Sequence, residues 1–184
     1  DKNALTSYVS EKEEGIQQLE KIIKRVLEDK ARFERELRIR QQQETLKTKS
    51  FKALKGQLPW PADGRIISKF GRQWNSKLKT TTENPGIDIK GKPGSSIRTV
   101  LGGVVTTITY IRGYGTTIIV DHGGGFYTVY SHVTNIQTNV DSQVRNGDVI
   151  AYMGDSGSIN GSKLHFEIWG KGQKLDPEKW LRKK

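Results

Sequence analysis

The hydrophobic pattern of this 184-residue chain changes its period near the segment GQLPWPADG, residues 56–64. Before it, residues 11–50 contain no proline and a single glycine, and apolar side chains recur at steps of three and four. After it, short apolar runs alternate with polar residues and end at Gly, Asn, Asp or Pro. The first pattern predicts a helix, the second predicts strands, and the prolines between them end any helix. We therefore expect a helical segment, residues 1–56, followed by a β domain, residues 57–184.

The helical segment carries an apolar stripe with the spacing of a coiled coil. Charged residues flank the stripe, which covers about three heptads and consists of Ile16, Leu19, Ile23, Val26, Phe33 and Leu37. A stripe of this kind needs a surface that covers it. The pattern is compatible with a longer coiled coil outside this chain, with another copy, and with a plain amphipathic helix docked on its own β domain.

The second half of the chain contains seven or more predicted short strands. They are the runs RIISKF, GIDIKG, GGVVTTITYI, GTTIIVDH, FYTVYSHV, GDVIAYMG and LHFEIW. The segment DHGGGF between two of these runs predicts a hairpin turn, because glycine adopts positive φ at no steric cost. The predicted fold class is α+β, a long N-terminal helix of the coiled-coil type followed by a β domain.

Charge and cysteine content exclude several classes of function. The chain has a formal net charge of +11 and no cysteine, which excludes disulfides, thiolate zinc sites and cysteine nucleophiles. The positive charge favours anionic partners such as nucleic acid, anionic lipid or acidic cell-wall polymers. No nucleic-acid-binding motif accompanies it, so we expect no nucleic-acid partner. No run approaches the roughly 20 apolar residues of a membrane span.

Two strands of the β domain each carry a histidine that is a candidate functional residue. In SKLHFEIW, residues 162–169, the alternation places His165 on one face with Lys163 and Trp169. In TVYSH, the same alternation places Tyr130 and His132 on one face. The third histidine of the chain precedes three glycines and reads as a polar turn residue.

Asp88 in NPGIDIKG completes a weak constellation with these histidines. A catalytic zinc ion needs at least three protein ligands, and Asp88 and His165 would supply two. Sequence spacing alone leaves open a metal site, a broken metal site and an ordinary strand with a histidine.

The order of the motifs from about Leu58 to Leu181 resembles the LytM-type, or lysostaphin-type, zinc metallopeptidases. NPGIDI is similar to the H-x-G-x-D element, and RGYGTTIIVDHGGGFYTVYSHV is similar to the G-Y-G strand followed by T-x-Y-x-H. VRNGDVIAYMGDSGS, KLHFEIW and LDPEKWL are similar to the glycine-rich turn region, the H-L-H-F-E strand and the N-P-x-x-W-L ending. The resemblance implies a mainly antiparallel β domain.

The resemblance also implies where this chain departs from active members. The three zinc-ligand positions hold Asn84, Asp88 and His165, and the two catalytic histidine positions hold His132 and Lys163. A neutral amide is a poor zinc ligand beside imidazole, and an ammonium repels a nearby divalent cation. We therefore expect no catalytic residue, no bound metal and no cofactor. We also expect Lys163 to take over the electrostatic role of zinc and to pair with Asp88.

A LytM-type domain without its metal, behind a coiled coil, resembles the murein hydrolase activators of the EnvC and NlpD kind. That resemblance implies a non-enzymatic activator of an N-acetylmuramoyl-L-alanine amidase in cell division and daughter-cell separation, exported to the periplasm or cell envelope. It implies an amidase-binding groove at Asn84, Asp88, Tyr130, His132, Lys163, His165 and Trp169. The alternatives are a zinc-dependent peptidoglycan endopeptidase with atypical ligands and a peptidoglycan-binding scaffold.

The same resemblance suggests two roles for the helical segment. Its apolar stripe could pack on the groove and make the chain autoinhibited, so that residues 1–56 are regulatory. Coiled coils of these activators are linked to the division-site FtsEX transporter, and we expect the part that would contact such a transporter to lie outside this chain.

Overall fold

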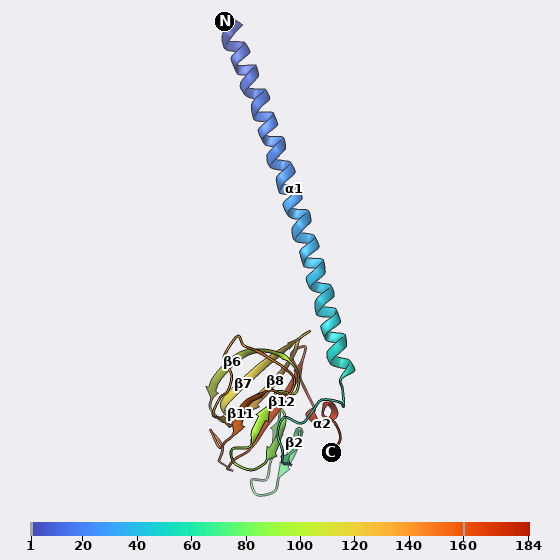
Figure 1. Ribbon diagram of the computed structural model, residues 1–184, viewed down its shortest axis with the longest axis vertical. Coiled ribbons are helices and arrows are strands. Elements are labelled where there is room, and N and C mark those ends of the chain that lie inside the picture. Colours follow the sequence, from blue (N-terminus) through green and yellow to red (C-terminus); the bar gives the residue numbers. More distant parts are fainter. Residues whose placement is uncertain (1, 160) are drawn as a thin grey trace. The chain divides into compact units, whose positions relative to one another are not determined.

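The computed structural model describes residues 2–159 and 161–184, which form two compact units (Figure 1). The first unit ends at Glu44, and the second is Thr45–Lys184. The helix α1 (Lys2–Ala53) makes up the first unit and contributes its last turns to the second. The second unit is otherwise built of strands, so the predicted α+β class is confirmed. A regulatory role for residues 1–56 stays a prediction.

The helix α1 runs without a break because its sequence is rich in strong helix formers and lacks proline. The predicted apolar stripe lies along its exposed surface. Ile16 is 57% exposed and Phe33 is 66% exposed. No helix in the described part of the chain combines the length and the apolar content that a membrane crossing requires.

The second unit, called the β unit below, contains one sheet of eight strands, two small sheets and a short C-terminal helix. The large sheet has the order β1-β4-β12-β8-β7-β6-β10 with β13 beside β12, the small sheets are β5-β11-β9 and β2-β3, and every pairing is antiparallel. The elements are β1 (Arg65–Ser68), β2 (Gly71–Asn75), β3 (Thr80–Asn84), β4 (Ile87–Lys90), β5 (Ser96–Arg98), β6 (Gly103–Ile111), β7 (Gly115–Gly123), β8 (Phe126–Ser131), β9 (Val133–Thr134), β10 (Gln143–Val144), β11 (Val149–Met153), β12 (Leu164–Gly170), β13 (Gln173–Leu175) and α2 (Pro177–Trp180).

Strand β12 lies inside the large sheet, between β4 and β8. Its side chains alternate between the two faces, as the sequence predicts. Leu164, Phe166 and Ile168 are fully buried in the hydrophobic core. His165 and Trp169 lie on the opposite face, which carries the polar residues discussed below.

The prediction that Tyr130 shares a face with His132 is wrong. Tyr130 lies opposite Phe166 in the β8–β12 register and is 0% exposed. Inside the core its hydroxyl accepts a hydrogen bond from the Val100 N–H. Strand β8 ends at Ser131, and His132 has a φ of 64°. This left-handed conformation ends the alternation, so His132 reaches the face that Tyr130 does not.

The three glycines of DHGGGF form the hairpin turn between β7 and β8, as predicted. Their φ values are 78°, 64° and 81°. Gly124 is required for a second reason. A Cβ there would lie 2.6 Å from the backbone nitrogen of Thr48, whose hydroxyl donates to the Gly124 carbonyl at 3.1 Å. The absence of a side chain at Gly124 therefore lets the last part of α1 pack closely against the turn.

Phe51 joins α1 to the β unit through an aromatic cluster. Its side chain is 2% exposed and stacks on Phe126 with ring centroids 4.0 Å apart. Trp180 of α2 lies 5.2 Å from the Phe51 ring and 5.9 Å from the Phe126 ring. Stacked and tilted aromatic contacts of this kind add to the free energy of burial.

Substitution of Phe51 by alanine should destabilise the β unit, because the cavity left between Phe126 and Trp180 cannot fill completely. We expect the free energy of unfolding to fall by about 3 to 5 kcal/mol. The measurement is urea denaturation followed by the fluorescence of the β unit. Phe33→Ala is the matched control on the same helix, and its exposed side chain should change the stability by less than about 0.5 kcal/mol. Equal effects of the two substitutions would contradict the packing role.

Candidate functional site

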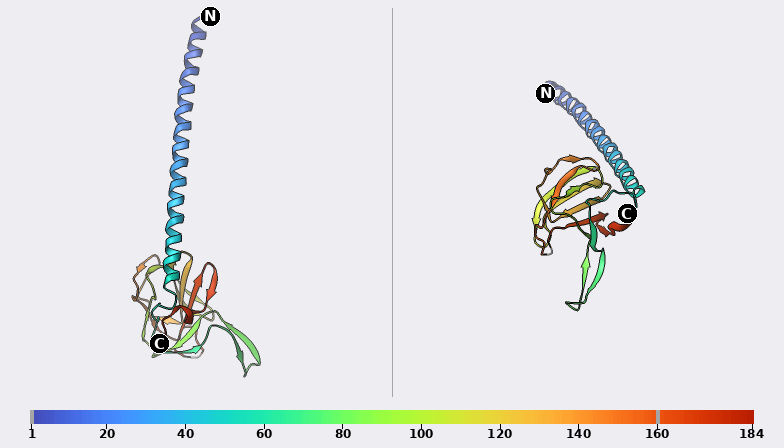
Figure 2. Two further views of the ribbon diagram at one scale, coloured as in Figure 1. Left: turned by 90° about the vertical axis from the view of Figure 1, so that its right-hand side faces the viewer. Right: turned by 60° about the horizontal axis from the view of Figure 1, so that its bottom comes forward.

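A polar cleft of about 210 Å³ gathers five of the seven predicted site residues. They are Asn84, Asp88, His132, Lys163 and His165. The β4–β12 register places Asp88 directly opposite His165. The β2–β3 hairpin, which projects from the β unit in Figure 2, supplies one wall of this polar cleft.

A chain of close ionic and hydrogen-bond contacts begins in the polar cleft and continues along β12 beyond it. Lys163 Nζ lies 2.7 Å from Asp88 Oδ2, and His165 Nδ1 lies 2.6 Å from Asp88 Oδ1. His165 Nε2 lies 2.8 Å from Glu167 Oε1, and Trp169 Nε1 donates to Glu167 Oε2 at 2.6 Å. The predicted pairing of Lys163 with Asp88 is therefore confirmed. We call this set of five side chains the charged chain.

Three members of the charged chain, Asp88, His165 and Glu167, have shifted pKa values. Burial alone would raise the pKa of the Asp88 and Glu167 carboxyls, but their hydrogen bonds to His165 and to Lys163 or Trp169 outweigh it and lower both pKa values. Burial would lower the pKa of His165, but the two carboxylates outweigh it and raise that pKa. Two carboxylates thus face an ammonium and an imidazole whose protonated form they stabilise.

The donor set does not fit a zinc ion. Each ring nitrogen of His165 faces a carboxylate oxygen, so the imidazole has no lone pair directed at a metal when it is protonated. The Asn84 amide nitrogen donates to Ser68 Oγ at 2.9 Å, and its oxygen accepts from the Gly86 N–H at 3.1 Å. Among residues 2–159 and 161–184, no three or more His, Asp or Glu side chains are arranged to hold a metal ion.

His132 differs from His165 in both contacts and charge. Its Nδ1 lies 2.6 Å from the Ser156 carbonyl oxygen, which can only accept, so Nδ1 carries the proton. Burial is the main cause that lowers the pKa of His132, and the positive charges of Lys163 and His165 lower it further. The surroundings of His132, at the edge of a charged cluster, therefore favour its neutral form.

Sequence reasoning missed Glu167 and Tyr114. Glu167 is 5% exposed and joins His165 to Trp169, and its position two residues from each places it on their face. That spacing was the available signal. The ring of Tyr114 lies edge-on to the His165 ring at 5.3 Å, and no periodicity indicates that contact.

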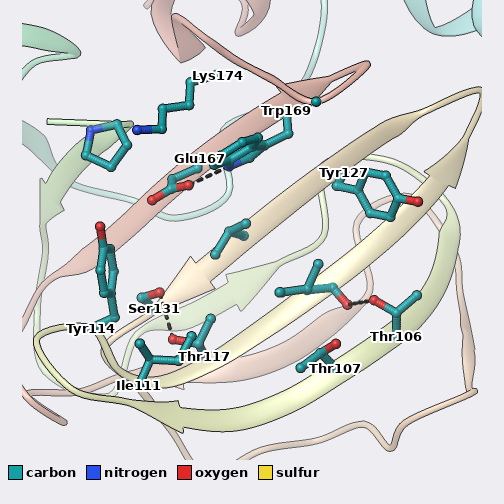
Figure 3. Close-up of a pocket in the computed structure, with 14 residues that line it drawn as sticks. Thr106, Thr107, Ile111, Tyr114, Thr117, Tyr127, Ser131, Glu167, Trp169 and Lys174 are labelled. Carbon is teal, nitrogen blue, oxygen red and sulfur yellow. Dashed lines mark hydrogen bonds between the residues drawn. The ribbon is translucent and has the colours of Figure 1, made fainter.

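A larger, mainly apolar groove adjoins the polar cleft on the same face of the large sheet (Figure 3). Its volume is about 740 Å³, and we call it the sheet groove. Strands β6, β7, β8 and β12 supply most of its lining, which is Pro85, Thr106, Thr107, Ile111, Tyr114, Thr117, Ile119, Tyr127, Val129, Ser131, Glu167, Trp169, Gly172 and Lys174. Pro85 and Tyr114 line both cavities, which therefore lie side by side. Trp169, predicted to lie in the groove, lines this part.

Known proteins with similar sequences support the motif assignment. The model of peptidase family M23 matches residues 82–177, just over half of the chain. The murein hydrolase activator EnvC of Escherichia coli is 33% identical over 129 residues, which cover 70% of this chain and 30% of EnvC. The murein hydrolase activator NlpD of E. coli is 35% identical over 123 residues, which cover 66% of this chain and 30% of NlpD. The chain thus spans about a third of the length of these relatives.

A solved structure confirms the fold. The crystal structure of a zinc-containing peptidase from Vibrio cholerae superimposes with a TM-score of 0.63 and 22% sequence identity. The match covers 70% of this chain and 41% of that chain. The β unit therefore has the fold of these peptidases.

His165 should titrate at a higher pH than the other two histidines. We expect His165 to titrate above the ordinary histidine pKa of about 6.5, and His122 and His132 to titrate below it because they are buried. Imidazole chemical shifts recorded by NMR against pH measure all three. In Glu167→Gln the His165 pKa should fall towards 6.5, because one of its two carboxylate partners is neutral.

The signs of these shifts also give a pH window for stability. The pairing of His165 stabilises the fold below its ordinary pKa, and this contribution is lost as pH rises through the raised pKa. The pairings of Asp88 and Glu167 stabilise the fold above the ordinary carboxyl pKa and are lost as pH falls through the lowered values. A His165 pKa at or below 6.5 would contradict the charged chain.

Proposed function

Because this chain belongs to peptidase family M23 but pairs its own charges where a metal would bind, we propose that it activates a peptidoglycan-cleaving enzyme without enzymatic activity of its own. The enzyme is an N-acetylmuramoyl-L-alanine amidase that acts in cell division and daughter-cell separation. The chain binds it through the sheet groove and the polar cleft.

The observation that carries this proposal is the Lys163–Asp88 ion pair. The resemblance to active members aligns Asp88 and His165 with two zinc-ligand positions. Here the Lys163 ammonium lies 2.7 Å from Asp88, and both nitrogens of His165 face carboxylates. A divalent cation would have to displace an ammonium from a side-chain pair that is only 13% and 12% exposed. Breaking such a pair is costly, so the site resists metal rather than attracts it.

The shape of the sheet groove supports binding of a protein segment. Its lining includes the apolar side chains of Ile119 and Val129 and the aromatic side chains of Tyr127 and Trp169, the last two labelled in Figure 3. Aromatic side chains beside an apolar floor are the usual anchors of a protein interface. An amphipathic helix could place its apolar face on this floor, with the adjoining polar cleft receiving its polar flank.

The similar proteins support the partner and the place of action. Two of them are named murein hydrolase activators, which by that name act on a hydrolase rather than as one. From them we infer a location in the periplasm or elsewhere in the cell envelope. Contacts with peptidoglycan and with an FtsEX-like transporter are further parts of the proposal, the second through coiled coil outside this chain.

Autoinhibition by α1 is the regulatory part of the proposal. The apolar stripe of α1 is exposed, and the sheet groove offers an apolar surface of the kind that would cover it. If the stripe occupied the groove, the amidase could bind only after the stripe had left. Activation would then reflect a shift between two states of this chain.

Release of dye from labelled peptidoglycan tests the activator function. Purified amidases of the same organism are assayed alone, with this chain, and with the variant Tyr127→Ala. We expect release only when an amidase and the chain are both present. Tyr127 is 38% exposed in the free chain, and a bound amidase would cover it, so loss of this aromatic anchor should weaken amidase binding by about 2 kcal/mol, or roughly 30-fold. Tyr110→Ala is the matched control, because Tyr110 is 66% exposed and lies outside the groove lining.

Three results would each contradict a part of the proposal. Release by this chain with added zinc and without amidase would establish a zinc-dependent endopeptidase with atypical ligands. Binding to sedimented peptidoglycan without any effect on an amidase would establish a scaffold. A loss of activation in Tyr110→Ala equal to that in Tyr127→Ala would place the amidase elsewhere on the β unit.

Removal of the first compact unit tests autoinhibition. The chain 45–184 keeps Phe51 and its aromatic cluster, whereas a cut after residue 56 would remove this buried side chain. We expect 45–184 to activate the amidase at a lower concentration than the full chain. The readout is the concentration of each that gives half-maximal dye release. Equal concentrations would show that residues 1–44 do not restrain the groove.

A further inference from the structure

The apolar stripe of α1 belongs to a longer heptad pattern. With Ile16 at position a, apolar residues occupy most a and d positions from Leu5 to Leu37. We call this set of positions the seam, and its members are Leu5, Val9, Lys12, Ile16, Leu19, Ile23, Val26, Lys30, Phe33 and Leu37. All of them are exposed in α1. The two lysines interrupt an otherwise apolar surface that is built to be covered.

The positions that flank the seam carry a single sign of charge. Positions e and g border the contact between two helices of a coiled coil and select the partner. Between residues 11 and 38 their charged residues are Glu13, Glu20, Asp29, Glu34 and Glu36. No lysine or arginine occupies an e or g position in that interval. The basic residues outside the seam are at b, c and f, namely Lys21, Lys24, Arg25, Arg32, Arg35 and Arg38.

This distribution opposes pairing of the chain with itself. In a parallel, in-register pair, Asp29 would face Glu34 of the other copy, and Lys30 would face Lys30 of the other copy inside the seam. In an antiparallel pair centred on the seam, Glu13 would face Glu34 of the other copy. No opposite charges meet across the e and g positions in either orientation. An ion pair with Arg32 at 2.9 Å offsets part of the charge of Asp29, so Glu34 is the main obstacle to both pairings.

We propose that the seam, when it does not occupy the sheet groove, binds a helix of different sequence whose e and g positions are lysine or arginine, and that its acidic flanks exclude a second copy. Opposite charges at these positions favour one pairing and like charges disfavour the other, which is how coiled coils acquire specificity. Lys12 and Lys30 add to this, because a partner with acidic or polar residues opposite them avoids placing two ammonium groups in one seam.

The middle of the seam indicates how the partner is held. Ile22 at g and Leu27 at e are apolar and 59% and 61% exposed, so the surface is widest there. The flanks are thus apolar at the centre of the seam and charged towards both of its ends, and we assign a different role to each part. The centre supplies most of the buried apolar area, and the ends decide which helix can bind.

A charge-reversed copy of the full chain tests the chemistry of the partner directly. The variant carries Glu13→Lys, Glu20→Lys, Asp29→Lys, Glu34→Lys and Glu36→Lys, so that it presents the basic flanks that we propose. Sedimentation equilibrium is measured for the wild-type chain, for the variant, and for their equimolar mixture. We expect the mixed pair to have a dissociation constant at least about tenfold lower than either self-pair, because two like-charge contacts become attractive.

The matched control reverses four basic residues that lie off the seam: Lys21→Glu, Lys24→Glu, Arg25→Glu and Arg35→Glu. Mixed with the wild-type chain, it should show no such gain. Circular dichroism checks that each protein keeps its helix. Salt provides a second measurement on the wild-type chain itself, whose self-association should be weak at low salt and should strengthen as salt screens the acidic flanks.

Three outcomes would overturn the proposal. A tight dimer of the wild-type chain at low salt would make a second copy the occupant of the seam. The mixture with the basic variant could stay monomeric while its helices are intact, which would mean that the seam is covered within the chain. Equal association of both variants with the wild-type chain would mean that the e and g charges do not select the partner.

Discussion

The ion pair between Lys163 and Asp88, continued through His165 to Glu167, is the interaction around which the β unit is organised. Four ionisable side chains lie in or beside two inner strands of the large sheet, and each of them meets an opposite charge or a hydrogen-bond partner. Burial of an unpaired charge would cost more than the sheet could offset, so the four must come together. Their contacts hold only in one register of β4 against β12, because a shift of one residue would move His165 and Glu167 into the core.

That register divides the large sheet into two faces with different roles. One face buries Leu164, Phe166 and Ile168 in the hydrophobic core. The other face carries the charged chain and the sheet groove, which share Pro85 and Tyr114. At two positions that the family resemblance assigns to zinc ligands, Asp88 and His165, the side chains pair within the chain instead. The surface beside them remains open and apolar, which suits recognition of a partner better than chemistry.

The helix α1 serves both units in different ways. Its last turns belong to the β unit, where Phe51 completes an aromatic cluster and Thr48 approaches a glycine turn. Its earlier turns expose an apolar seam between acidic flanks. Helices in proteins gain most of their stability from packing of an apolar face, so an uncovered seam is one surface that we propose for a partner, and the sheet groove is the other. The charges beside the seam and the aromatic residues beside the groove restrict which partners fit.

The sequence by itself determined a long helix followed by strands, and among those strands β1, β4, β6, β7, β8, β11 and β12 with the glycine turn between β7 and β8. These follow from local rules, namely helical and strand periods and turn residues. The pairing of Lys163 with Asp88 was implied by the family resemblance, which aligned both residues with the metal site. Only the tertiary structure decided that Tyr130 faces the core, that Glu167 completes the charged chain, and that Phe51 docks on Phe126 and Trp180. The reason is that alternation assigns faces only while a strand continues. The left-handed turn at His132 ends it, and contacts between distant segments depend on packing that no local period encodes.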